Sequence, residues 1–76
     1  MSNYSKLNEF RFRFENKETG KTSYFDISCY GDIYKQIDIY KKDLKQLCLV
    51  GVSNDTHRII EVIHLFNNDV IYKGGN

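Results

Sequence analysis

Phe10-Arg11-Phe12-Arg13-Phe14 is the stretch that decides the fold of this 76-residue chain. Side chains on a β-strand point alternately to the two faces of a sheet, so the three phenylalanines share one face and the two arginines share the other. The aromatic face must be buried, and the basic face must be in contact with water. The pattern therefore predicts a half-buried strand in an antiparallel sheet with one solvated side.

The neighbouring residues extend this strand to a hairpin. We expect a first strand over residues 7–15, a polar loop over 16–21 and a second strand over 22–28. Pairing of the two strands would bring Asp26 within reach of Arg11 or Arg13 across the wet face. Such an exposed pair would help to set the register more than it would stabilise the fold.

The hydrophobic period becomes helical after Gly31. The residues of this apolar stripe are Ile33, Ile37, Tyr40, Leu44 and Leu47. They predict a helix over 32–47 that covers the sheet. Asp32 in its first turn and lysines in its last turns suit the helix dipole.

The rest of the chain predicts further strands. Residues 47–52 are an apolar run typical of a buried strand, and 53–56 read as a turn. Residues 57–66 are ambiguous, because their apolar residues have helical spacing but are mostly β-branched, which favours a strand. We prefer the strand there, followed by a turn at 67–69 and a last strand over 70–73.

The expected fold is thus a small single α+β domain over residues 1–76. It consists of an antiparallel sheet, in the order ββαβββ, with one helix packed on it. Residues 1–6 and 74–76 are expected to be flexible ends.

Composition narrows the classes of function. The formal net charge is only +1, so domain-wide attraction to nucleic acid or to an anionic membrane is not expected. No apolar run is long enough for a membrane span, and the N-terminus lacks a signal-peptide pattern, so the expected location is the cytoplasm. Lys, Asn, Ile, Tyr and Phe, whose codons are AT-rich, make up 34 of the 76 residues, which indicates an AT-rich genome.

Cysteines and histidines, which could bind a metal or act as nucleophile and base, are few, and their spacing does not match a known kind of site. Cys29 and Cys48 lie nineteen positions apart and His57 and His64 seven apart, without the close ligand pairs of a zinc site. Both cysteines are expected to be reduced, buried thiols, since burial quenches their reactivity. No strained nucleophile turn or phosphate loop is present. We therefore expect no metal, no cofactor and no catalysis.

Two surfaces are candidates for binding a partner. The first is the wet face of the sheet, where Arg11, Arg13 and Tyr24 would form a compact patch of the residue types enriched in interface hot spots. The second is the outer face of the helix, which would present a different set of side chains. Its residues are Lys35, Ile39 and Lys42.

The leading hypothesis is a non-catalytic protein-binding domain. At the level of class, so small a domain from an AT-rich genome resembles the accessory proteins of phages and mobile elements, many of which block a host or defence protein by occupying its surface. The partner would then be such a protein or a nucleoprotein complex. One alternative is a small nucleic-acid binder that uses the Arg/Tyr face, and another is a homo-oligomeric structural or regulatory subunit.

Overall fold

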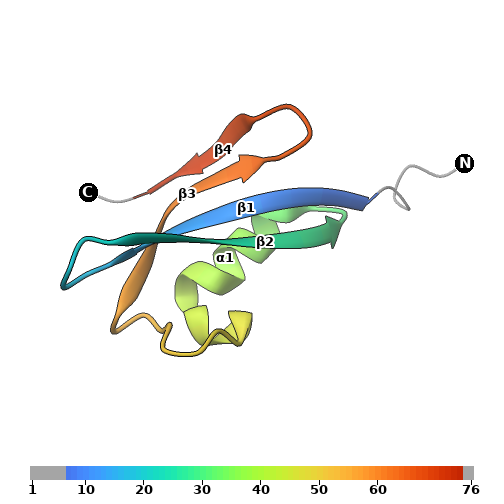
Figure 1. Ribbon diagram of the computed structural model, residues 1–76. Coiled ribbons are helices and arrows are strands. Elements are labelled where there is room, and N and C mark those ends of the chain that lie inside the picture. Colours follow the sequence, from blue (N-terminus) through green and yellow to red (C-terminus); the bar gives the residue numbers. More distant parts are fainter. Residues whose placement is uncertain (1–6, 75–76) are drawn as a thin grey trace, which may run out of the picture.

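The hairpin expected from the alternating phenylalanines and arginines is present in the computed structural model, which describes residues 7–74 (Figure 1). Strand β1 spans Leu7–Asn16 and strand β2 spans Thr22–Tyr30. They pair antiparallel, with Arg11 opposite Asp26 and Arg13 opposite Tyr24. This register turns the three phenylalanines of β1 to one side, where they are buried, and confirms the alternation read from the sequence.

Two more strands complete a four-stranded antiparallel sheet in the order β2-β1-β3-β4. Strand β3 spans His57–His64 and strand β4 spans Asp69–Lys73. The preference for a strand over a helix in residues 57–66 is thus confirmed. The α+β class, with strands before and after a single α-helix, is confirmed as well.

Helix α1, Ile33–Lys42, lies across one face of this sheet (Figure 1). It begins where the carboxylate of Asp32 accepts a hydrogen bond from the backbone N–H of Tyr34, 2.9 Å away, as an N-cap does. The side chains buried between helix and sheet form the core. They are Phe10, Phe12, Phe14, Cys29, Ile33, Ile37, Leu44, Leu47, Ile59 and Val62.

The expectation of one unbroken helix over 32–47 was wrong at Asp43. The backbone of this residue is extended, with φ −152°, and its carboxylate accepts from the backbone N–H of Lys45. Asp43 therefore ends α1 and caps a separate 3-10 helix, η2, Leu44–Leu47. Short acidic side chains compete for nearby backbone N–H groups in this way, which is why they interrupt helices.

A strand over residues 47–52 was also predicted and is absent from the described chain. Cys48 takes a left-handed conformation with φ 58°, and Gly51 has φ 77°, so the segment turns twice. Within the segment the backbone N–H of Val52 donates to the carbonyl of Leu49, a local bond of a turn rather than of a sheet. Val50 is fully exposed, and Cys48 is exposed rather than buried as expected.

A register shift explains why β3 resembles a helix in sequence. Arg13 of β1 is opposite Glu61, but the next residue, Phe14, is opposite Ile59, so Ile60 is an extra residue in β3. Such a bulge lets Ile59 and Val62, three positions apart, both face the core. Three-residue spacing is otherwise a helical signal.

The expected flexible ends lie mostly outside the described residues, at 1–6 and 75–76. Gly74 is described, and its backbone N–H donates to the carbonyl of Ile60 at 2.9 Å.

Candidate binding face

The face of the sheet opposite α1 is covered by no described helix (Figure 1). We call the cluster at its centre the open face and define it by Arg11, Arg13, Tyr24, Asp26 and Glu61. Strand alternation places these side chains on the side away from the phenylalanines, and the pairing of β1 with β2 and β3 sets them next to one another. The structure therefore brings together the three residues predicted for this face.

Arg11 and Asp26 form an exposed bidentate ion pair. The Arg11 Nε and Nη2 atoms donate to the two carboxylate oxygens of Asp26 at 2.8 and 3.0 Å. The hydrogen bond from Arg11 lowers the pKa of Asp26 below its ordinary value, and the same bond raises the pKa of Arg11. The fork geometry fixes the guanidinium plane, so this arginine is held in one orientation although it is exposed.

Arg13 is held more deeply than Arg11. Its Nη1 donates to Glu61 Oε1 at 2.9 Å, and the two side chains are 32% and 14% exposed. Its Nε is buried with no hydrogen-bond partner among the described residues. Arg13 is therefore mainly a residue that positions its neighbours, whereas Arg11 is accessible to a partner.

The ring of Tyr24 lies against both arginines. The guanidinium carbons of Arg11 and Arg13 are 5.5 and 5.6 Å from the ring centroid, within the range of cation–π attraction. Tyr24 is nevertheless 59% exposed. An exposed aromatic ring held by two ordered neighbours loses little conformational freedom when it is covered by a partner.

The second predicted surface lies elsewhere. Lys35, Ile39 and Lys42 are exposed on α1, while Ile33 and Ile37 are buried against the sheet. At 100° per residue the first three fall on the side of the helix turned away from the sheet. The sheet set and the helix set therefore face opposite directions, and one compact contact cannot use both.

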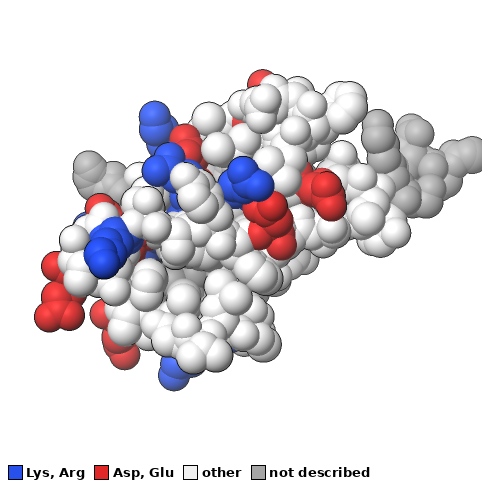
Figure 2. Space-filling model, viewed as in Figure 1, with Lys and Arg blue, Asp and Glu red and all other residues white. Residues whose placement is uncertain are grey.

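Charges of both signs are interspersed over the face shown in Figure 2. On the open face this mixing has a specific cause, since each arginine is matched by a carboxylate. Asp26 was anticipated from the hairpin register, but the pairing of Glu61 with Arg13 was not. It depends on the bulge at Ile60, for which the sequence holds no clear signal.

Three further features concern residues 7–74. No group of three or more His, Cys, Asp or Glu side chains there is placed to hold a metal ion. Cys29 and Cys48 are both free thiols. No helix in the same residues is long and apolar enough to cross a membrane.

Comparison with known proteins found no matching family model, no matching curated protein and no matching solved structure.

Proposed function

We propose that this chain is a non-catalytic protein-binding domain whose contact surface is the open face, with Tyr24 at its centre. The observation that supports this most is the exposed Tyr24 ring, which lies within cation–π distance of two ion-paired guanidinium groups. Tyrosine and arginine dominate interface hot spots because they bury much surface at a modest cost in entropy. The domain would act by occupying the surface of a larger host or defence protein, or of a nucleoprotein complex.

The charges of the open face favour a protein over a nucleic acid. Binding to a phosphate backbone requires cations that exchange counterions for phosphates. Arg11 and Arg13 are instead each bound to a carboxylate, so the cluster has no net formal charge. A partner surface with its own mixture of charges and an apolar site for the tyrosine ring matches this pattern better than a polyanion does.

Apolar side chains around the cluster extend the proposed contact. On the same side of the sheet, Tyr30 is 62% exposed and Val70 is 50% exposed. Interfaces commonly combine a few aromatic anchors with apolar and polar neighbours that exclude water. The open face offers such a combination.

The test is an affinity pull-down from a lysate of a low-GC bacterium, with and without nuclease, using three forms of the protein. The variants are Tyr24→Ala and Tyr34→Ala. The second is a matched control, because Tyr34 is 58% exposed and belongs to α1, which packs on the other face of the sheet. We expect one protein to be retained by the wild type and by Tyr34→Ala, and lost with Tyr24→Ala, regardless of nuclease.

Three other results would contradict the proposal. Retention abolished by nuclease would indicate nucleic acid. Loss with Tyr34→Ala alone would transfer the contact to the helix. Self-association by light scattering, with no retained protein, would indicate a homo-oligomer.

A further inference from the structure

A second site lies away from the open face, where the C-terminal end of α1 meets the loop between β1 and β2 and the start of β3. A half-open pocket of about 250 Å³ is found there. The polar residues that line it are Lys17, Lys41, Asn54, His57, Arg58 and Tyr72. Lys17 comes from the loop, Lys41 from α1 and Arg58 from β3, so the fold gathers cations that are distant in sequence.

No carboxylate lines this pocket. Lys17 donates to the backbone carbonyl of Asn54, and the ammonium of Lys41 lies 5.0 Å from the centroid of the Tyr72 ring. Neither lysine forms an ion pair with a carboxylate of the described residues. The positive charge of this site is therefore only partly compensated, in contrast to the open face.

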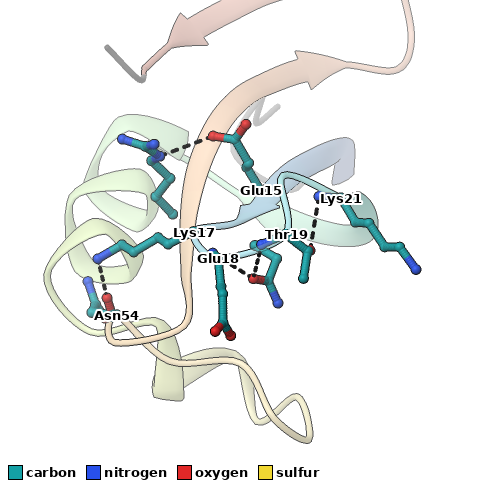
Figure 3. A network of polar contacts seen from close by, with 8 residues as sticks. Glu15, Lys17, Glu18, Thr19, Lys21 and Asn54 are labelled. Atoms are coloured by element: carbon teal, nitrogen blue, oxygen red, sulfur yellow. Dashed lines mark hydrogen bonds and ion pairs between the residues drawn. The ribbon is translucent and has the colours of Figure 1, made fainter.

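Arg58 is the one cation of the pocket that has an acidic partner. Its Nε donates to Glu15 Oε1 at 3.1 Å. Figure 3 shows Glu15 near the contact between Lys17 and Asn54. The single bond to Glu15 leaves the two terminal guanidinium nitrogens without a hydrogen-bond partner within residues 7–74. They are the atoms with which arginine holds phosphate oxygens.

Asn54 is hydrogen-bonded to the segments around the pocket. Its Oδ1 accepts from the backbone N–H of Leu44 at 2.6 Å, and its Nδ2 donates to the carbonyl of Lys41 at 2.9 Å. The backbone carbonyl of Asn54 also accepts the bond from Lys17. Asn54 therefore connects α1, η2 and the loop between β1 and β2. The carbonyl of Lys41, at the negative end of the helix dipole, is thereby engaged and would repel an anion less.

We propose that this pocket binds a phosphoryl group, either as inorganic phosphate or as a small phosphomonoester. With Glu15 counted, the three cations leave a net formal charge of +2 at the site. This charge matches a group that carries about −1.5 to −2 charges at neutral pH better than it matches a single carboxylate. The volume is somewhat below the roughly 300–1,000 Å³ of sites for drug-sized ligands, which suits a phosphate with little attached. This inference is independent of the protein partner at the open face.

The test is a nuclear magnetic resonance titration of the folded, full-length protein with sodium phosphate, adenosine monophosphate and adenosine, at constant ionic strength. We expect saturable shifts in the backbone signals of Lys17, Lys41 and Arg58 with the two phosphate-bearing probes and none with adenosine. Tighter binding of adenosine monophosphate would identify a phosphomonoester as the better ligand, and equal binding would identify phosphate alone.

Lys41→Gln should weaken phosphate binding about tenfold, the usual effect of losing one charged hydrogen bond. Lys35→Gln is the matched control, because it removes the same charge from the far side of α1 and should change affinity less than about twofold. Arg58→Gln gives a second test should Lys41→Gln unfold the domain. Absence of saturable shifts, equal weakening by Lys35→Gln, or binding of adenosine itself would overturn the proposal.

Discussion

The ion pair between Arg13 and Glu61 should couple the two central strands of the sheet more strongly than any exposed pair. We consider the changes Arg13→Gln and Glu61→Gln, singly and together. At the observed 2.9 Å, the gross Coulomb attraction is about 1.4 kcal/mol with the dielectric constant of water and about 6 kcal/mol with an effective value near 20. Loss of hydration offsets much of this attraction.

The burial of the two side chains sets the net value. Exposed pairs contribute about 0.2–1 kcal/mol, whereas breaking a fully buried pair costs about 3–5 kcal/mol. Arg13 and Glu61, at 32% and 14% exposed, lie between these limits. We therefore expect a coupling energy of about 1–2 kcal/mol from the double-mutant cycle.

Urea unfolding of the four proteins measures this coupling, since a chain of this length has a free energy of unfolding of roughly 4–11 kcal/mol, well above the expected effect. The matched cycle is Arg11→Gln with Asp26→Asn, the exposed pair, which should give a smaller coupling energy. A coupling below about 0.5 kcal/mol for Arg13 and Glu61, or one no larger than in the control cycle, would refute the reasoning. It would then be wrong to treat Arg13 as a positioning residue.

Three further effects are expected. Phe12→Ala should destabilise the domain by about 3–5 kcal/mol in urea unfolding, because this side chain is fully buried and its ring meets Tyr40 edge to face. The lowered pKa of Asp26 means that the folded protein binds fewer protons than the unfolded chain in acid. The stability from this pair is therefore present above the unfolded pKa and is lost as pH falls through the folded one, a loss that Asp26→Asn should remove from a pH series of melting curves. Cys48→Gly should be neutral or should stabilise the fold by up to about 1 kcal/mol, because glycine adopts the left-handed conformation of this position without strain. Gly51→Ala, at φ 77°, should destabilise the fold for the converse reason. The opposite order of the two variants in thermal unfolding would contradict these backbone conformations.

The parts of the fold that depend on local alternation could be predicted from the sequence. The alternation in residues 10–14 predicted which side of β1 is buried, and the expected hairpin brought Asp26 near Arg11 or Arg13. The observed register decides between the two and pairs Asp26 with Arg11. These features require only neighbouring residues and one short loop. The same holds for the start of α1 at Asp32.

Features that depend on distant pairing could not be predicted. The partner of Arg13 is set by the bulge at Ile60, and a bulge is decided by the packing of β3 as a whole. The apolar run that includes Val50 resembles a strand, but the left-handed conformations of Cys48 and Gly51 turn it. The residues of the cationic pocket come from segments up to 55 positions apart, between Lys17 and Tyr72, so no local motif marks them.

Reversing the charge of both arginines would remove the basic groups of the open face. Arg13→Glu, however, would set a second carboxylate against Glu61, which is mostly buried, and would destabilise the sheet. Tyr24 is the better target, since its exposed ring can be truncated without removing a core contact.

The most direct measurement of whether the open face binds a protein is oxidative footprinting of tyrosine side chains, read by mass spectrometry, on the free domain and on its complex with the retained partner. Tyr24 and Tyr34 are almost equally exposed in the free domain. Each can serve as an internal reference for the other, because Tyr24 belongs to the sheet and Tyr34 to the helix. We predict that complex formation protects Tyr24 from oxidation and leaves Tyr34 unchanged. Protection of Tyr34 with Tyr24 still reactive would show that the partner binds the helix side and would contradict the proposed function of the open face.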